Sequence, residues 1–196
     1  MTDIKLVCFD LDDTLTTENS WAKLNVAFGI TPEEDYAMYR QFVDGEISYL
    51  EWTEKLATLY RERGVATEAV ALKAFHSIEL VAGASELMRN LRSKGYELAV
   101  LSASFNHLAT DVAGRLGINL VYGCAQLECG GNGKVTNLFT HDDEEGAKVQ
   151  KLHEWCDELS IDITEVACVG DGANDRKLFQ ATGHGITFTD SPIKEV

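Results

Sequence analysis

Short apolar runs alternate with amphipathic stretches along most of the chain. Each run is three or four residues long and is bounded by polar residues or glycine, which is typical of strands buried in a sheet. The runs are Leu6 to Phe9, Leu98 to Leu101, Leu120 to Tyr122, Val166 to Val169 and Gly185 to Phe188. Between them, apolar residues recur at helical spacing, at Ala84, Leu87, Met88 and Leu91, at Leu108, Val112 and Leu116, and at Leu152, Trp155, Cys156 and Leu159. This alternation predicts an α/β fold, with a parallel sheet that helices cover on both faces.

The segment that follows the first strand has a different pattern. Residues 18–78 contain no convincing strand, and two capping boxes, Thr31 to Glu34 and Ser48 to Glu51, predict helix starts. Apolar stripes at helical spacing follow the two boxes, at Tyr36, Tyr39 and Val43 and at Trp52, Leu56 and Leu59. We therefore expect a small helical cap at 18–78, placed above the carboxyl end of the first strand of a core formed by 1–17 and 79–196. The glycine-rich stretch from Cys129 to Val135 predicts a hairpin turn.

The composition is that of a globular protein with a strongly acidic balance. Of the 196 residues, 45% are hydrophobic and 25% are charged, and the formal net charge is -15. This charge argues against a nucleic-acid partner, because a phosphate backbone is bound by clustered Lys and Arg. It also repels a small phosphorylated ligand at long range. A phosphate site here therefore requires local positive charge from a metal, a lysine or helix amino ends.

The sequence also bears on location and on the state of the cysteines. The apolar runs are far shorter than the roughly 20 residues that span a bilayer, and no signal-peptide pattern precedes the first run. We therefore expect a cytoplasmic protein that has no membrane partner. Five cysteines form neither an even framework nor a CxxC pair, so most of them are expected to be buried, reduced thiols.

Acidic residues follow directly on the first strand, in the order Asp10-Leu11-Asp12-Asp13-Thr14. In an open α/β sheet this position is the carboxyl edge, where ligands bind. Side chains alternate along a strand, so Asp10 and Asp12 can point into one pocket and share a metal. An acidic turn that caps a helix is the alternative, and this motif alone does not separate the two.

A second acidic group follows the strand Val166 to Val169, in Gly170-Asp171-Gly172-Ala173-Asn174-Asp175. Its acids lie at the same edge of the predicted sheet as Asp10. Hard oxygen ligands in this number suit Mg²⁺, and glycine at 170 and 172 allows the backbone to approach the metal closely. The alternative is a glycine-rich loop with solvated acids.

Two residue types that bind phosphate lie between these acidic groups. Ser102 ends the strand Leu98 to Leu101, and Lys148 lies near the start of the helix that runs to Leu159. A hydroxyl and a following amide at a junction between strand and helix can donate to phosphate oxygens, and a lysine supplies a point charge. Taken singly, Ser102 also fits a helix cap and Lys148 a solvated surface position.

In order, Asp10 to Thr14, Ser102, Lys148 and Gly170 to Asp175 resemble the four motifs of the haloacid dehalogenase superfamily. The helical insertion, the Gly-Asp-Gly-x-Asn-Asp signature and Ala147-Lys148 resemble its phosphoserine phosphatase-like branch. The resemblance covers nearly the whole chain. It implies a Rossmann-like parallel sheet core with a helical cap.

The resemblance also implies a role for each matching residue. Asp10 would attack phosphorus to form an aspartyl-phosphate, and Asp12 would protonate the leaving oxygen and then activate water. Asp10, Asp171 and the backbone carbonyl of Asp12 would hold Mg²⁺, with Asp175 in reach of the metal or of Lys148. Thr14 would orient the first loop. The implied phosphate contacts are Ser102, Lys148, Asn174 and the backbone amides of Leu11 and Ala103.

The chain departs from this branch where the substrate would be recognised. Phosphoserine phosphatases use a glutamate shortly after the first motif and a cap arginine, but Asn19 stands at the early position beside Glu18, and no arginine occurs between Arg40 and Arg61. A charged group left unpaired weakens binding strongly, so we expect a substrate other than plain L-phosphoserine. The cap candidates for specificity are Glu18, Asn19, Trp21, Tyr39, Arg40 and Phe42. The aromatic residues among them also fit a cap core, and Arg40 fits a solvated helix position.

We therefore predict a Mg²⁺-dependent phosphatase for a small phosphorylated metabolite, acting as a monomer or homodimer. Two alternatives remain open from the sequence. One is a phosphotransferase that passes the phosphoryl group from Asp10 to a small alcohol, and the other is a metabolite-binding protein of the same fold without turnover. A dehalogenase is a weaker alternative, because it requires neither Mg²⁺ nor the second carboxylate, Asp12.

Overall fold

The computed structural model of the chain describes residues 3–188. Six strands form one sheet in the order β4-β3-β2-β1-β5-β6, and every neighbouring pair is parallel except β3 and β4. The strands are β1 (Leu6–Phe9), β2 (Glu97–Phe105), β3 (Leu120–Cys129), β4 (Val135–Phe139), β5 (Val166–Val169) and β6 (Gly185–Ile186). The predicted parallel sheet is thus confirmed.

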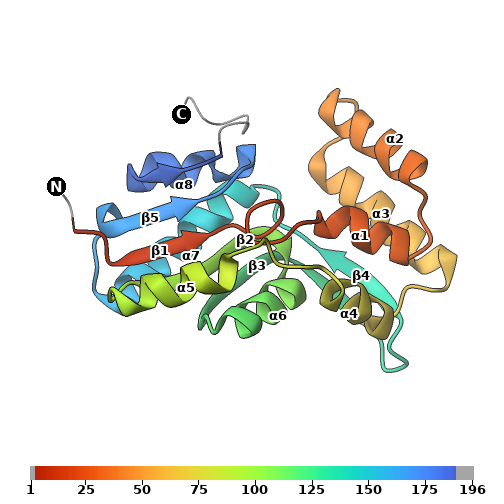
Figure 1. Cartoon of the computed structure of the whole chain (residues 1–196). Helices are drawn as coiled ribbons and strands as arrows, with labels where there is room; N and C mark the ends of the chain where they lie inside the picture. Colours follow the sequence, from red (N-terminus) through yellow and green to blue (C-terminus); the bar gives the residue numbers. More distant parts are fainter. Residues whose placement is uncertain (1–2, 189–196) are drawn as a thin grey trace.

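Alternation along the strands divides the core between the two faces of the sheet. Val7 and Phe9 belong to a buried cluster that includes residues of α5 (Ala84–Ser93) and α6 (Asn106–Leu116). Leu6 and Cys8 belong to a second cluster, with residues of α7 (Glu144–Leu159) and α8 (Arg176–Thr182). Both faces are apolar because helices cover both, as Figure 1 shows, and this explains the continuous apolar runs in the sequence.

Four helices form the segment between β1 and α5, which we call the cap (residues 18–78), and they lie beyond one end of the sheet in Figure 1. They are α1 (Ser20–Ala27), α2 (Pro32–Val43), α3 (Tyr49–Arg63) and α4 (Glu68–His76). Both predicted capping boxes are present, at Thr31 with Glu34 and at Ser48 with Glu51. The exact boundaries of the cap stay a prediction, although Thr16 and Leu80 pair where the two connections run side by side.

The apolar stripe predicted for the first of the two capped helices, at Tyr36, Tyr39 and Val43, is wrong as a buried face. Tyr36 and Val43 are exposed by 60% and 55%, and α2 buries no residue fully. The helix instead packs through partly buried Met38 and Phe42, whereas Trp52 of α3 is buried as expected. Helix α2 lies at the edge of the cap, where α1 and α3 cover only one of its faces, and the capping signals do not reveal which face that is.

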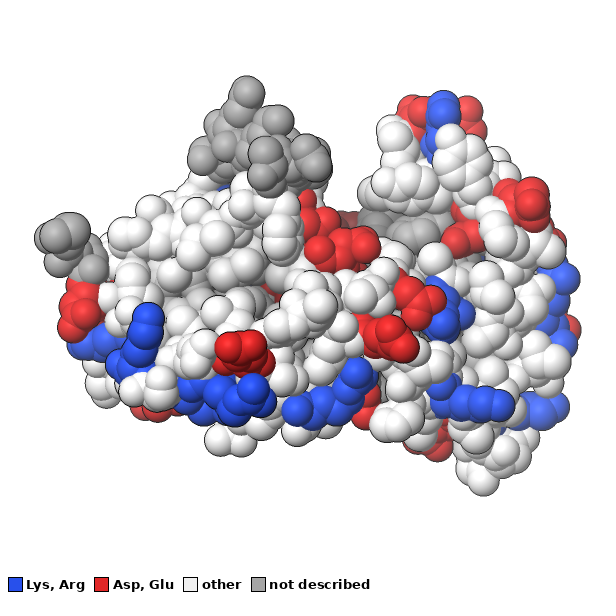
Figure 2. All heavy atoms as spheres, viewed as in Figure 1, with Lys and Arg blue, Asp and Glu red and all other residues white. Residues whose placement is uncertain are grey.

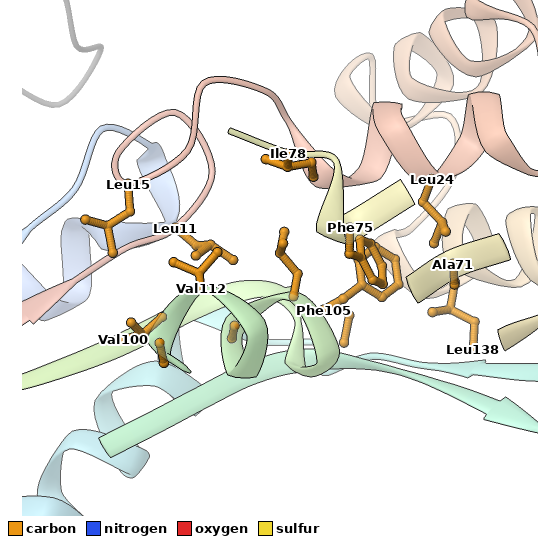
Figure 3. Close-up of a cluster of buried hydrophobic side chains, with 14 of the residues drawn as sticks. Leu11, Leu15, Leu24, Ala71, Phe75, Ile78, Val100, Phe105, Val112 and Leu138 are labelled. Carbon is orange, nitrogen blue, oxygen red and sulfur yellow. The ribbon is translucent and has the colours of Figure 1, made fainter. Parts of the chain in front are cut away.

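The cap and the core share one hydrophobic cluster. Figure 3 shows Leu24 and Phe75 from the cap beside Phe105 and Val112 from the core. The ring of Phe105 lies 5.2 Å from that of Phe75 and 4.5 Å from that of Trp21, measured between centroids. The cap is therefore held to the core by buried contacts as well as by its two connections.

Strand lengths differ from the sequence-based expectation. Strand β2 runs on through Ser102 to Phe105, and β3 continues to Cys129, because both pair beyond their apolar runs. Strand β6 ends at Ile186 instead of Phe188, because its partner β5 ends at Val169. The predicted hairpin joins β3 to β4.

The structure also describes the state of the cysteines and the lengths of the helices. All five cysteines are free and four of them are buried. Within residues 3–188, no helix has the length and apolar character that crossing a membrane requires.

Phe105→Ala is expected to lower the free energy of unfolding by about 3–5 kcal/mol, because it empties a fully buried site between cap and core. Urea unfolding followed by tryptophan fluorescence and by circular dichroism measures the change. Since the cluster is shared, both signals should move together in one transition. Phe139→Ala, on a side chain that is 52% exposed, is the control and should change stability by about 0.5 kcal/mol at most. Separate cap and core transitions in the parent protein would contradict a shared cluster.

Candidate active site

The two acidic motifs meet because their strands are neighbours. Strands β1 and β5 pair in parallel with Phe9 opposite Val169, and the amide of Asp10 donates to the carbonyl of Val169 over 2.8 Å. Asp10 and Gly170 therefore leave the sheet side by side at its carboxyl edge. Asp10 continues the alternation of Leu6 and Cys8, which directs its side chain to the face that α7 covers.

Lys148 reaches this edge from α7 and lies between two carboxylates. Its Nζ is 3.0 Å from Oδ1 of Asp10 and 2.6 Å from Oδ1 of Asp175. The Lys148 side chain has no exposed surface, and both carboxylates are almost fully buried. Burial opposes the charge of the ammonium group, but the two carboxylates outweigh burial and raise the pKa of Lys148. The lysine is therefore a fixed positive charge in a site that needs one.

Three carboxylates offer a place for a metal ion. Among the described residues, Asp10, Asp171 and Asp175 each present an oxygen, and these oxygens all lie within 4.8 Å of one another. Burial and the charge of Asp10 raise the pKa of both Asp171 and Asp175. Three hard oxygen donors crowded in this way fit a divalent cation such as Mg²⁺, which would offset their repulsion. The hydroxyl of Thr14 donates to Asp171 Oδ1 over 3.3 Å.

The glycine at 170 is required for close approach. A Cβ atom at this position would lie 2.2 Å from Oδ2 of Asp175. The structure shows close approach to the carboxylate of Asp175, and the expected approach of this backbone to a metal stays a prediction. At Gly172, the nearest atom to an added Cβ would be Oδ1 of Asn174, at 2.8 Å. Both glycines thus leave room for side chains of the same loop.

Asp12 does not belong to the carboxylate group around Asp10. Its Oδ2 accepts a hydrogen bond of 2.5 Å from Ser20 of α1, and the Ser20 hydroxyl also contacts Ser104 Oγ at 2.5 Å. Burial raises the pKa of Asp12 to about 7, although the bond from Ser20 lowers it. A carboxyl group with this pKa can both give and take a proton near neutral pH.

The phosphate-binding candidates from the middle of the chain lie near Asp10 without sitting where the sequence suggested. Ser102 is inside β2, three residues short of its end, and its Oγ accepts a hydrogen bond of 3.1 Å from the amide of Ser104. Ser102 and Ala103 line the same cavity as Asp10. Asn174 lines it too, and its buried Oδ1 has no hydrogen-bond partner within the described residues. Leu11 is fully buried, and its carbonyl accepts from the amides that close the first loop.

A cavity of about 740 Å³ lies between the core and the cap. The core side contributes Asp10, Asp12, Asp13, Ser102, Ala103, Ser104, Asp142, Asp143, Glu144, Glu145, Asp171, Gly172, Ala173 and Asn174, and the cap side contributes Asn19, Trp21, Ala22, Asp35, Tyr39, Phe42, Tyr49 and Trp52. In Figure 2, acidic side chains gather in the notch between the two halves of the molecule, while Lys and Arg lie mostly along the lower edge of this face.

The candidates for specificity in the cap fall into two groups. Asn19, Trp21, Tyr39 and Phe42 line the cavity, and the side chain of Asn19 also caps α1 by accepting from the amides of Trp21 and Ala22. Glu18 and Arg40 are not among the lining residues. Glu18 pairs with Lys23, and Arg40 pairs with Asp44 on the exposed face of α2.

The structure adds residues that sequence reasoning missed. Tyr49 of the cap donates a hydrogen bond to Glu144 at the start of α7, and burial raises the pKa of Glu144 to about 7. Ser20 joins the cap to Asp12. Neither pair has a sequence signal, because their members are separated by 95 and 8 positions and only the cap packing brings them together.

Comparisons with a family model and with curated relatives indicate related families of hydrolases. A model of haloacid dehalogenase-like hydrolases matches residues 4–183. The chain is 31% identical to a phosphoserine phosphatase of Campylobacter jejuni over 97% of its own length and 89% of the relative's. It is also 31% identical to a phosphoserine phosphatase of Archaeoglobus fulgidus, over 96% of its own length, but it spans only 54% of that protein.

Solved structures show the same fold. A phospho-aspartyl intermediate analogue of phosphoserine phosphatase superposes with a TM-score of 0.79 at 24% identity, covering 97% of this chain and 89% of the other. A HAD family hydrolase of Salmonella enterica gives a TM-score of 0.83 at 19% identity, covering 98% and 65% of the two chains.

Lys148→Met is expected to lower the free energy of unfolding by about 3–5 kcal/mol, because it leaves two buried carboxylates without their counter-charge. Added Mg²⁺ should restore part of the loss, since a divalent cation binds the carboxylates that the lysine released. Urea unfolding with and without Mg²⁺ measures both effects. Lys151→Met, one turn along α7, removes an ion pair with Glu154 near the surface and the contacts of Nζ with the rings of Tyr122 and Trp155, each 5.8 Å away, and it should cost only about 1–2 kcal/mol. Equal losses for the two variants would show that the buried ion pairs do not organise the site.

Proposed function

This chain belongs to the haloacid dehalogenase-like hydrolases, and on that premise we propose that it is a Mg²⁺-dependent phosphatase that hydrolyses a small phosphomonoester through a phosphorylated Asp10. The observation that carries the proposal is the position of Asp10. Its carboxylate lines the cavity, is held by buried Lys148, and lies within 4.8 Å of two further carboxylates that suit a metal. A carboxylate fixed in this way can attack phosphorus without rearranging.

The first half of the proposed reaction transfers the phosphoryl group to the protein. A carboxylate oxygen of Asp10 forms a bond to phosphorus while the bond from phosphorus to the ester oxygen breaks. Asp12 gives its proton to the departing oxygen, so an alcohol leaves. The raised pKa of Asp12 supports this role, because a protonated carboxyl group must be present near neutral pH.

The second half returns Asp10 to its starting state. Asp12, now ionised, takes a proton from a water molecule as the water oxygen attacks phosphorus, and the bond between phosphorus and Asp10 breaks. Inorganic phosphate leaves and Asp12 is protonated again. Ser20 and Ser104 hold Asp12 in position through both steps, since their hydroxyl groups form a hydrogen-bonded chain to its Oδ2.

Asp10, Asp171 and Asp175 are the side chains that would hold Mg²⁺, and the backbone carbonyl of Asp12 is a further proposed ligand. When bound, the cation supplies positive charge to the transferring phosphoryl group. Lys148 adds a second positive charge beside Asp10 and fixes Asp175 at the same time. Together these groups offset the acidic field of the chain at the one place where a phosphate must enter.

The remaining phosphate contacts are proposed from the core. Ser102, Asn174 and the backbone amides of Leu11 and Ala103 would bind the oxygens of the phosphoryl group. Thr14 would hold the first loop against Asp171 through its hydroxyl. The proposed cap specificity residues are Asn19 and the aromatic side chains that line the cavity, whereas the pairing of Glu18 with Lys23 and of Arg40 with Asp44 gives those two residues no support from geometry.

Action on a small metabolite, a cytoplasmic location and a monomeric or homodimeric state stay predictions. The cavity supports a small substrate, because its volume of about 740 Å³ suits a molecule of metabolite size. Plain L-phosphoserine stays an unfavoured substrate on the sequence argument.

Phosphate release from a panel of phosphorylated amino acids, amino alcohols, sugars and nucleotides should require Mg²⁺, and EDTA should abolish it. Asp10→Asn should reduce kcat by at least about 1,000-fold, because the covalent step is lost. Asp157→Asn is the control and should leave kcat unchanged, because Asp157 is an exposed residue of α7 that does not line the cavity.

Each other outcome changes the proposal in a definite way. Release that survives EDTA or Asp10→Asn would remove Asp10 from the mechanism. Alcohol product in excess of free phosphate, when a small alcohol acceptor is added, would indicate a phosphotransferase. Binding of a phosphorylated compound by well-folded protein without turnover would indicate a metabolite-binding protein.

A further inference from the structure

The cap wall of the cavity is built from aromatic rings. Trp21, Tyr39, Phe42, Tyr49 and Trp52 all line it and come from α1, α2 and α3. Their ring centroids lie 5.6 Å apart for Trp21 and Trp52, 5.7 Å for Phe42 and Trp52, and 6.2 Å for Tyr39 and Trp52. The rings thus form one continuous surface opposite the acidic floor that holds Asp10. Tyr39 keeps 47% of its surface exposed, so the wall is open to a ligand.

The charge of the lining is entirely negative. Nine of the described lining residues are acidic, and none of the lining residues in that part of the chain is Lys, Arg or His. Lys148 does not line the cavity and is already paired with Asp10 and Asp175. A ligand in this cavity therefore contacts carboxylates and the faces of aromatic rings. No cationic side chain of the described lining is available to pair with a negatively charged group of the ligand.

Several of these acids are already engaged by other groups. Asp10 and Asp171 belong to the proposed metal site, Asp12 is bonded to Ser20, and Asp143 pairs with Lys177. Five lining acids remain without an ion pair among the described residues, and they are Asp13, Asp35, Asp142, Glu144 and Glu145. Of these, Asp35 accepts a hydrogen bond from Asn25, and Glu144 accepts one from Tyr49. All five line the same cavity as Asp10, so the leaving group of a phosphomonoester bound at Asp10 would share the cavity with them.

This chemistry disfavours a leaving group with negative charge and favours one with positive charge. A leaving group with a carboxylate or a second phosphate would lie against unpaired acids, and no lining Lys or Arg is available to bind it. A neutral polyol would donate hydrogen bonds to the lining carboxylates, but it would gain no attraction from their charge. A cation, by contrast, is attracted both by the faces of Trp, Tyr and Phe and by the nearby carboxylates.

We propose that the substrate is the phosphate ester of an amino alcohol, with a positively charged nitrogen, preferably quaternary, against the aromatic wall and no carboxylate. This inference rests on the proposed phosphatase function, because Asp10 places the phosphate and the wall receives the leaving group. A quaternary nitrogen is favoured over a primary ammonium because its methyl groups contact rings, while a primary ammonium loses its hydrogen bonds to water there. An arginine in the cap would repel such a substrate through its positive charge. The absence of an arginine between Arg40 and Arg61 therefore favours a cationic leaving group.

Steady-state kinetics with matched esters tests the proposal. The substrates are phosphocholine, its neutral isostere in which a tert-butyl group replaces the trimethylammonium group, O-phospho-L-serine, and p-nitrophenyl phosphate. We expect kcat/KM for phosphocholine to exceed that for the isostere by about tenfold or more, since the two differ only in charge. O-phospho-L-serine should be poorer than phosphocholine because of its carboxylate. Equal values for phosphocholine and its isostere, or a preference for O-phospho-L-serine, would overturn the proposal.

The fourth substrate, p-nitrophenyl phosphate, distinguishes failure of the proposed cation site from failure of the proposed phosphatase function, because its leaving group is activated and carries no cation. Hydrolysis of p-nitrophenyl phosphate that depends on Mg²⁺ and Asp10, without preference for phosphocholine, would leave the phosphatase function in place and overturn the cation site.

If no ester is hydrolysed, binding of choline alone tests the cavity. Choline should change the fluorescence of Trp21 and Trp52 at about one-tenth the concentration that its tert-butyl alcohol analogue requires. No difference between the two alcohols would overturn the cation site.

Variants of α2 test the wall itself. Tyr39→Leu should lower the preference for phosphocholine over its isostere by about threefold or more, and Tyr39→Phe, which keeps the ring, should retain it. Tyr36→Leu is the matched control, because Tyr36 is an exposed tyrosine of the same helix that does not line the cavity. Circular dichroism confirms that each variant folds. An unchanged preference in Tyr39→Leu would remove Tyr39 from the site, and an equal loss in Tyr36→Leu would show that the effect is not local.

Discussion

A lysine with no exposed surface, held between two buried carboxylates, is the constraint on which the rest of this molecule depends. Lys148 can stay charged only if Asp10 and Asp175 both reach it, at 3.0 and 2.6 Å. That geometry requires β1 and β5 to be neighbours, α7 to cover the face to which Asp10 points, and glycine at 170, where a side chain would displace Asp175. The parallel sheet therefore does more than support the site, because its strand order and its alternation select which charges meet.

The cap contributes side chains that contact acidic residues of the core. Ser20 holds the carboxyl group of Asp12, which the core leaves outside the cluster of metal-binding candidates, and Tyr49 reaches Glu144 at the start of α7. The shared cluster around Phe105 and Phe75 fixes the cap so that these contacts form. Charge is also unevenly placed, since Lys148 is buried beside Asp10 and the cavity lining in the described residues contains nine acids and no Lys, Arg or His. On the proposed function, the phosphate end of a ligand would lie beside Lys148 and a cation, and the other end would face acidic and aromatic side chains.

Sequence patterns predicted those parts of the molecule that local rules determine. Apolar runs bounded by polar residues or glycine predicted the strands, and capping boxes predicted the starts of α2 and α3. The positions of Asp10 and Asp171, each directly after a strand, predicted that both lie at one edge of the sheet. The patterns failed where packing between distant segments decides the result. The stripe at Tyr36 and Val43 faces solvent because no neighbour covers it, and β2 continues past Ser102 because β3 pairs with it there. The contacts of Ser20 and Glu144 have no local signature, because they depend on how the cap docks.

The most direct test of the central claim is to look for the phosphoryl group on Asp10. The parent protein and Asp12→Asn would be mixed with p-nitrophenyl phosphate and Mg²⁺, quenched in acid, digested and analysed by mass spectrometry. We expect a phosphorylated peptide that contains Asp10, in larger amount in Asp12→Asn because the second step there lacks its base. Release of phosphate with no phosphorylated protein at any quench time, or phosphorylation of a peptide without Asp10, would contradict the assignment of Asp10 as the nucleophile.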